Sequence, residues 1–236
     1  MLIFKMKPLP PSQVYEQELK FMPYKKSLKR VEETIVSQMP HNGSLLDLMS
    51  GPGYLLGRIA RRRPDLSLRG VDLDQEYIRH AQERYPKISF SVGDVLNWKH
   101  KGSFDAVICT GALHHIPYRQ QEKVVRRISS MILPGGFGIV SDCYVDDFSN
   151  ETERQLAAAK LGYEYLRETI ENGAPKKVIE ATADILSNDI LMAEFKTSIA
   201  KRTPIFKKYF QQVKTFRTWP TKSSGYGDYI TILKPK

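Results

Sequence analysis

The chain has 236 residues, of which 41% are hydrophobic and 26% are charged. That composition is typical of a globular chain with one large core, and no apolar run reaches the roughly 18–20 residues that span a bilayer, so we expect no membrane partner. The formal net charge is +10. It leaves nucleic acid open as a partner, although the basic residues are spread along the chain as on solvated helix faces.

The first residues, MLIFKMKPLPP, have only a short apolar start and predict no signal peptide. The only cysteines are Cys109 and Cys143, each near the end of an apolar run. They are predicted to be small buried hydrophobes, and neither a disulfide nor a zinc site is expected. We therefore expect a cytoplasmic protein without a bound metal.

Residues 1–40 are predicted to form an N-terminal helical extension or lid. Helical spacing occurs at Ser12–Leu19 and Tyr24–Met39, and Pro23 separates the two segments.

Strand and helix patterns alternate over residues 44–145. The predicted strands are Ser44–Met49, Ser67–Asp72, Ile88–Val92, Phe104–Thr110 and Phe137–Asp142. The predicted helices are Tyr54–Arg63, Gln75–Arg84 and Arg119–Met131. This alternation indicates an α/β fold with a parallel sheet covered on both faces, whose ligands bind outside the carboxyl ends of the strands.

Residues 145–204 are predicted to be a helical insertion. Asn150 and Glu153 resemble a capping box that begins a helix, and a last helix should end near Arg202 because Pro204 follows. Two strands at 212–219 and 226–233 should then pair antiparallel at the sheet edge. We assign residues 41–236 to one domain that contains this insertion.

The segment LLDLMSGPGYL carries an acid just before its glycines. Asp47 ends the first strand, and Gly51 and Gly53 follow. A carboxylate there would repel a pyrophosphate, whereas S-adenosylmethionine has no phosphate and carries a sulfonium and an amino group. Asp72 ends the second strand, where it can hold ribose hydroxyls. The motif therefore favours S-adenosylmethionine as the cofactor.

Further candidates follow the next strands. Asp94 could accept from an adenine amino group, although it could also be a turn former. The backbone N–H of Val95 could serve a ring nitrogen, and Leu73 could pack on the base. His114 and His115 follow the fourth strand as candidate catalytic bases for a hydroxyl acceptor, with a purely structural role as the alternative. An amine acceptor would need no base.

Five segments in this order resemble the class I S-adenosylmethionine-dependent methyltransferases of the small-molecule type: LLDLMSGPGYL, GVDLDQEYI, FSVGDVLNW, FDAVICTGALHHI and ISSMILPGGFGIVSD. The resemblance implies a doubly wound, mostly parallel, seven-stranded Rossmann-like sheet with an antiparallel last hairpin. It also implies that Asp47, Gly51 and Gly53 contact the methionine end of the cofactor, and that Asp72 contacts the ribose. Asp94 would contact the adenine, and Thr110 and Gly111 would face the transferred methyl.

One position departs from the family pattern. Met49 stands where the first of three alternating glycines is expected. Its side chain must point away from the ligand or narrow the pocket.

The predicted function is methyl transfer to an O, N or C atom of a small-molecule acceptor. The positive charge keeps an RNA (tRNA or rRNA) methyltransferase as an alternative, and Met49 keeps a cofactor-binding module without catalysis. A nicotinamide-dependent oxidoreductase, suggested by the spacing of Gly51, Gly53 and Gly57, is disfavoured by Asp47 and Asp94. The sequence predicts neither the acceptor nor the oligomeric state.

Overall fold

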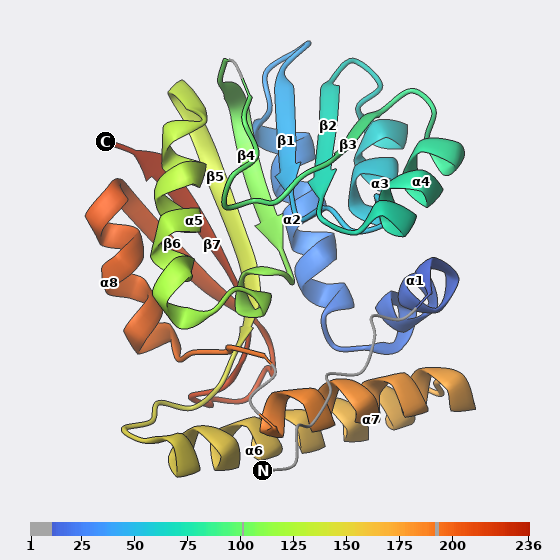
Figure 1. The fold of residues 1–236 in the computed structure, drawn as a ribbon, viewed down its shortest axis with the longest axis vertical. Helices are drawn as coiled ribbons and strands as arrows, with labels where there is room; N and C mark the ends of the chain where they lie inside the picture. The colour runs from blue at the N-terminus through green and yellow to red at the C-terminus, as the bar shows by residue number, and fades with distance from the viewer. Residues whose placement is uncertain (1–10, 101, 192–193) are drawn as a thin grey trace.

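The computed structural model describes residues 11–100, 102–191 and 194–236. Residues 1–10, which include most of the segment that predicts no signal peptide, lie outside the described residues. Within the described part of the chain, one seven-stranded sheet has the order β3-β2-β1-β4-β5-β7-β6 (Figure 1). The strands are β1 (Ser44–Leu48), β2 (Ser67–Asp72), β3 (Ser89–Val92), β4 (Phe104–Thr110), β5 (Ile132–Tyr144), β6 (Phe210–Trp219) and β7 (Gly227–Pro235).

The pairing of the strands confirms the predicted fold class. β1 pairs in parallel with β2 and β4, β2 with β3, and β4 with β5. β7 is antiparallel to both β5 and β6, so the last hairpin closes the sheet edge as expected. The order reverses between β1 and β4, which is where ligands bind in open α/β sheets.

The helices include two before the sheet and a long pair inserted ahead of β6. They are α1 (Ser12–Phe21), α2 (Lys25–Gln38), α3 (Tyr54–Arg62), α4 (Gln75–Arg84), the short 3₁₀ helix η1 (Leu113–His115), α5 (Tyr118–Ser130), α6 (Glu151–Glu171), α7 (Lys176–Ile190) and α8 (Ile199–Tyr209). Among the described residues, no helix combines the length and apolarity that a membrane span requires.

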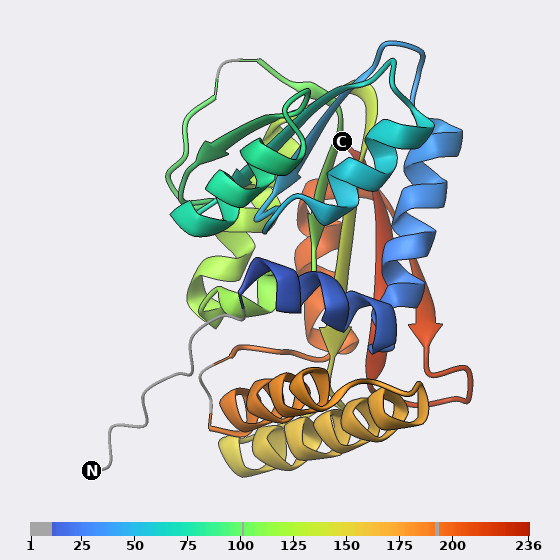
Figure 2. The ribbon, with the colours of Figure 1, turned by 90° about the vertical axis from the view of Figure 1, so that its right-hand side faces the viewer.

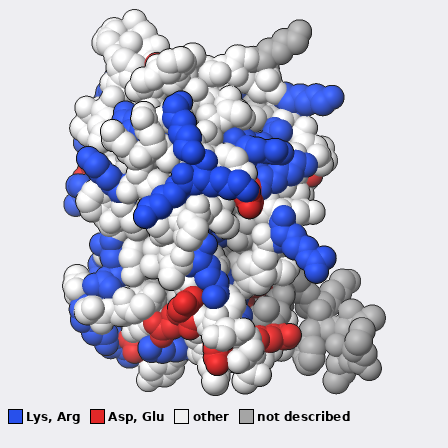
Figure 3. Space-filling model, turned by 90° about the vertical axis from the view of Figure 1, so that its left-hand side faces the viewer, with Lys and Arg blue, Asp and Glu red and all other residues white. Residues whose placement is uncertain are grey.

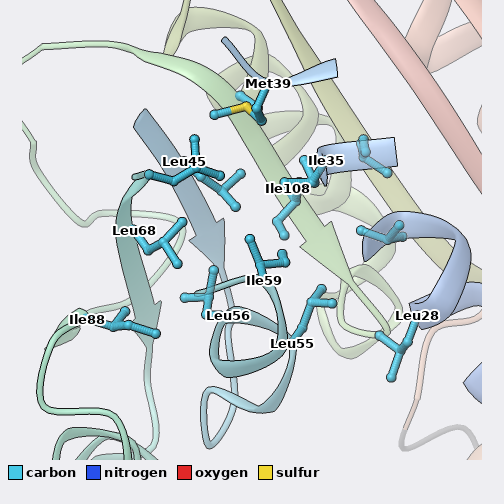
Figure 4. Close-up of a cluster of buried hydrophobic side chains, with 14 of the residues drawn as sticks. Leu28, Ile35, Met39, Leu45, Leu55, Leu56, Ile59, Leu68, Ile88 and Ile108 are labelled. Atoms are coloured by element: carbon cyan, nitrogen blue, oxygen red, sulfur yellow. The ribbon is translucent and has the colours of Figure 1, made fainter. Parts of the chain in front are cut away.

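Helices cover both faces of the sheet because successive strand residues point to opposite sides. Leu45 on β1 packs with α2, α3 and α4, and Figure 4 shows its neighbours Ile35, Leu56 and Ile108. The next residue, Leu46, belongs to the cluster under α5 and α8. Two cores, one on each face, therefore hold the strand ends in place.

The carboxyl ends of the parallel strands face the N-terminal helices and the insertion. α6 and α7 lie side by side across that end of the molecule, and α1 lies between them and the strands (Figures 1 and 2). The start of α6 has the expected reciprocal caps: the Glu153 N–H donates to the Asn150 side chain at 2.9 Å, and the Ser149 N–H donates to the Glu153 carboxylate at 2.6 Å.

Two local predictions were wrong. α8 does not end near Arg202 but continues through Pro204 to Tyr209. Pro204 removes only one helical hydrogen bond, and the burial of Phe206 (0% exposed) beyond it favours continuing the helix. β5 begins at Ile132, five residues before the predicted start, because Ile132 pairs with Phe104 and the Pro-Gly-Gly run forms an irregularity within the strand.

Candidate functional site

The ends of β1, β2 and β4 bring three of the predicted residues to one edge. Asp47 lies opposite Gly70 on β2 and Ile108 on β4. Asp72 and Thr110 are the last residues of β2 and β4. The topology therefore gathers the acid of the first motif, the acid of the second and the residue expected near the methyl group.

Asp47 is the most unusual group at this edge. Its residue is 1% exposed, and its Oδ1 atom has no hydrogen-bond partner among the described residues. Burial, and then the charge of Asp72, raise the pKa of Asp47 well above its usual value. A buried carboxylate oxygen without a partner is costly, so this position favours a ligand that brings a cation or a hydrogen-bond donor.

Asp72 ties the glycine turn to the second strand. Its Oδ2 accepts from the Gly51 N–H at 2.7 Å, and its Oδ1 accepts from the Asp74 N–H at 2.9 Å. Gly53 has φ 79°, and a Cβ atom there would lie 2.7 Å from the Phe90 ring. Glycine is required at that position by both the left-handed backbone and the close approach of Phe90.

Met49 has φ 62°, the left-handed conformation that the missing glycine would adopt without strain. Its side chain lines a small crevice over the turn, together with Tyr15, Leu19, Leu28, Ser50, Tyr54, Leu55 and Thr110. Met49 thus lines the crevice and also packs against the core cluster under α5.

The helix α1 covers this crevice. The ring of Tyr15 lies 3.9 Å from the position of a Cβ atom built on Gly51. Burial, followed by the charges of Asp47, Glu18 and Asp72, raises the pKa of Tyr15. Tyr15 and Glu18 are site neighbours that the sequence reasoning did not single out for the cofactor, because their helix reaches the strand ends only through the tertiary fold.

The adenine-side candidates lie at the rim. Leu73 is 70% exposed, an unusual exposure for a large apolar side chain that has no packing role. Val95 is buried in the core under α5. Asp94 closes a local turn: Oδ1 accepts from the Leu96 N–H at 2.8 Å, and Oδ2 accepts from the Asn97 side-chain amide at 3.1 Å. Its turn-forming role is thus present in the structure.

The two histidines occupy different environments. His114 is buried, and its Nδ1 lies 2.5 Å from Asp142 Oδ1, while its Nε2 lies 3.7 Å from Glu194 Oε2. Burial alone would lower the pKa of His114, but the Asp142 charge outweighs it and holds that pKa well above its usual value. His115 is exposed at its surface. Desolvation of its ring and the neighbouring His114 charge lower the pKa of His115 to about 4.

His114 begins a chain of alternating charges that the sequence did not reveal. Glu194 pairs with Lys196, Lys196 lies 3.4 Å from Asp189, and Asp189 pairs with Arg154. The chain links the end of β5 to α6 and α7. Ligand atoms of His114, His115 and Glu194, or of His114, Asp142 and Cys143, lie within 4.8 Å of one another and could hold a metal ion. The Lys196 ammonium, however, already supplies Glu194 with a cation.

A mostly parallel seven-stranded sheet, with buried acids rather than phosphate-binding groups at its switch point, defines an α/β protein that binds a positively charged nucleoside cofactor. The comparisons with known proteins agree with that class. Residues 45–136 match the family model described as a methyltransferase domain.

Two curated relatives cover similar parts of the chain. A trans-aconitate 2-methyltransferase of Mycobacterium tuberculosis is 33% identical over 93 residues, which are 39% of this chain and 34% of that protein. Another, of Methylobacterium radiotolerans, is 26% identical over 113 residues, 48% of this chain and 42% of that protein. The chain thus matches less than half the length of either relative.

Solved structures extend the likeness to nearly the whole fold. The PH0226 protein of Pyrococcus horikoshii has a TM-score of 0.61 and 18% identity, covering 90% of this chain and 91% of that one. A TehB-like methyltransferase of Corynebacterium glutamicum has a TM-score of 0.60 and 13% identity, covering 95% and 98%. Over residues 45–136, the chain therefore resembles the class I S-adenosylmethionine-dependent methyltransferase family.

S-adenosylmethionine is the cofactor of that family, and the described residues fit it. The unpartnered Asp47 oxygen offers a carboxylate to a cationic ligand, and the left-handed glycines leave room for a close approach of the backbone.

Proposed function

We propose that this chain transfers the methyl group of S-adenosylmethionine to an O, N or C atom of a small-molecule acceptor. The observation that carries the proposal is the buried, unpartnered Asp47 beside a glycine turn held by Asp72. The curated relatives named as trans-aconitate methyltransferases, and the similar fold of a sugar N-methyltransferase, support a small acceptor.

The residues at the strand ends divide the cofactor between them. Asp47, Gly51 and Gly53 would hold its methionine end, and Asp72 its ribose hydroxyls. Leu73 would cover the exposed face of the adenine. Thr110, which lines the crevice, would face the methyl group. Bound there, the cofactor supplies an electrophilic methyl carbon on a positively charged sulfur.

Asp94 and Val95 would contact the adenine edge. Each Asp94 oxygen already accepts one hydrogen bond in the turn and has a further lone pair for the adenine amino group. The backbone N–H of Val95 remains the proposed donor to a ring nitrogen.

The histidines differ as catalytic candidates. His114 already shares its Nδ1 proton with Asp142, so it would position its neighbour rather than take a proton from the acceptor. His115 is neutral at pH 7 because its pKa is about 4, so it can accept a proton from a hydroxyl acceptor. An amine acceptor would need neither residue.

The N-terminal helices and the insertion would enclose the acceptor. α1 covers the glycine turn, while α6 and α7 lie beyond it (Figure 2). We propose that residues 12–38 and the α6–α7 pair act as a lid that moves to admit both ligands.

Calorimetry with S-adenosylhomocysteine tests the binding half of the proposal, and transfer of tritium from methyl-labelled cofactor into a deproteinised cell extract tests the catalytic half. Binding with labelled product is the expected result. Binding without any labelled product would favour the cofactor-binding module, and absence of binding by the folded protein would reject the proposal.

A second candidate, an RNA methyltransferase, is favoured by one surface. Figure 3 shows Lys and Arg side chains gathered on the face that carries α5 and α8. The exposed basic residues of α5, α8 and β6 are Arg119, Lys123, Arg126, Lys201, Lys207, Lys208 and Lys214. RNA binding as a function predicts tight affinity that falls steeply with salt, measurable by filter binding with tRNA. Weak binding without an effect on turnover would reject this candidate.

A further inference from the structure

A second buried carboxylate lies at the same end of the sheet, on β7. Asp228 is 0% exposed. Its Oδ1 accepts a hydrogen bond from the Tyr165 hydroxyl at 2.5 Å, but its Oδ2 has no hydrogen-bond partner in the part of the chain that the structure describes. A buried orphan oxygen of this kind needs an explanation, and an absent ligand is one.

The register places Asp228 at the carboxyl edge, since it pairs with Cys143 at the end of β5. Ile230, two residues further on, packs in the core cluster that includes α2. Because side chains alternate along a strand, Asp228 faces the same side as Ile230, toward α2 and α6.

Two tyrosines from the proposed lid elements approach this group. Tyr165 of α6 donates to Asp228 and packs edge-on against Trp219, with ring centroids 4.9 Å apart. Tyr24, which precedes α2, donates to Ser141 Oγ at 3.2 Å, and its ring lies 3.1 Å from the position of a Cβ atom on Gly111. Tyr24 therefore lies between Gly111, which is expected to face the methyl group, and the region around Asp228.

The surroundings of Asp228 favour its protonated form in the ligand-free protein. The charge of Lys26 on α2 lowers the pKa of Asp228, but the Lys26 ammonium forms its ion pair with Glu168 of α6, at 2.9 Å. Asp142 on β5 and Glu168 are further acids near Asp228, and burial together with them raises the pKa of Asp228 to about 8. No ion pair to Asp228 occurs among the described residues, so a ligand that brings an N–H donor or a positive charge would lower the pKa of Asp228 and stabilise its carboxylate.

Building on the proposed methyl transfer, we propose that Asp228 binds the acceptor and that the acceptor is an amine. The acceptor binds as the free amine, with an N–H that donates to Asp228. Its nitrogen lone pair forms the new bond to the methyl carbon, while the electron pair of the breaking C–S bond stays on sulfur. The positive charge thereby moves from sulfur to the methylated nitrogen, where the Asp228 carboxylate stabilises it. No further co-reactant is required, because the amine proton can remain on the product ammonium.

This acceptor differs from that of the relatives named for trans-aconitate. A polycarboxylate would bring negative charge next to Asp228 and Asp142, which costs free energy in a buried site. Aromatic Tyr24 and Tyr165 beside a carboxylate suit a compact amine, since aromatic faces attract cations.

The test uses the full chain, methyl-tritiated cofactor and a deproteinised extract of bacterial small molecules, with the products separated by cation and anion exchange. For the wild-type protein we expect label in the fraction that cation exchange retains. Asp228→Asn keeps an acceptor oxygen for Tyr165 but lacks the charge, and should lower that labelling about 10- to 100-fold. Its S-adenosylhomocysteine affinity should stay unchanged.

Two further proteins separate a local role from general damage. Asp146→Asn, at a surface pair with Lys160, should label as the wild type does. Tyr165→Phe should lose less activity than Asp228→Asn, since the carboxylate stays. Label only in the acid fraction, or full labelling by Asp228→Asn, would overturn the role of Asp228 and leave methyl transfer standing. Cofactor binding without labelled product in any fraction would reject both proposals.

Discussion

Nδ1 of His114 lies 2.5 Å from Oδ1 of Asp142, and both side chains are buried. The positive charge of His114 thus lies beside the negative charge of Asp142 at the end of β5. Glu194 lies on the other side of the His114 ring, and Lys196 pairs with Glu194. Replacing His114 with Gln would leave Asp142 buried without its cation. We expect a loss of about 3–5 kcal/mol in the free energy of unfolding, measured by urea denaturation. A stable His114→Gln protein with normal turnover would contradict this assignment.

His115 provides the matching test of catalysis. Because we infer an amine acceptor, His115→Ala should retain most of the wild-type turnover in steady-state kinetics at pH 7, with little change in stability since the side chain is exposed. A loss of about 100-fold or more in kcat would instead indicate a hydroxyl acceptor that needs a base. Comparing this variant with His114→Gln separates a chemical role from a structural one.

Asp47→Asn should weaken S-adenosylhomocysteine binding about 10- to 100-fold, because the ligand loses a charge-assisted hydrogen bond. The same change should raise the melting temperature of the ligand-free protein above the usual carboxyl pKa, since the wild type must then either keep a proton on Asp47 or bury its charge. Asp65→Asn, at the Arg63 ion pair on the opposite edge, is the control and should bind normally. Equal affinities for all three proteins in calorimetry would remove the basis of the cofactor site.

Met49 can be tested by a pair of substitutions. Both Met49→Gly and Met49→Ala widen the crevice, so both should bind S-adenosylhomocysteine more tightly than the wild type. Only glycine relieves the left-handed backbone at φ 62°, which costs about 1–2 kcal/mol for other residues. Met49→Gly should therefore be the more stable of the two in thermal melts. Weaker binding by both variants would show that the Met49 side chain contacts the cofactor favourably.

Asp228 should make stability depend on pH. Its pKa is about 8 in the folded chain against a usual value of 3.8, so the folded state holds the proton more tightly than the unfolded state. The stabilising protonated form is lost as pH rises, and stability should fall between about pH 4 and pH 8 and level off above. Asp228→Asn removes this contribution, which is a slope of up to about 1.4 kcal/mol per pH unit in the free energy of unfolding.

The measurement is urea denaturation of both proteins at several pH values across that window. The variant should gain stability over the wild type as pH rises, and this difference isolates Asp228 from other titrating groups. A difference independent of pH would show that Asp228 is ionised throughout.

Much of the sheet was predictable because its signals are local. The runs that became β2 and β4 were predicted to the residue, since apolar segments between polar turns fix them. The order of the Asp47 and Asp72 motifs predicted which strand ends carry acids. The end of α8 and the start of β5 were predicted wrongly from Pro204 and the Pro-Gly-Gly run. Burial of Phe206 and pairing of Ile132 outweighed these local preferences.

The sequence by itself determined the fold class, the cofactor motif and the conflict at Met49, because strand patterns and glycine spacing act over a few residues. Only the tertiary structure decided that His114 is bound to Asp142, that Tyr15 covers the glycine turn, and that Asp228 is buried with a free oxygen. His114 and Asp142 are 28 positions apart in the sequence, and Asp228 and its partner Tyr165 are 63 positions apart. They depend on which helices the folded sheet brings to its carboxyl end, and no local pattern encodes that.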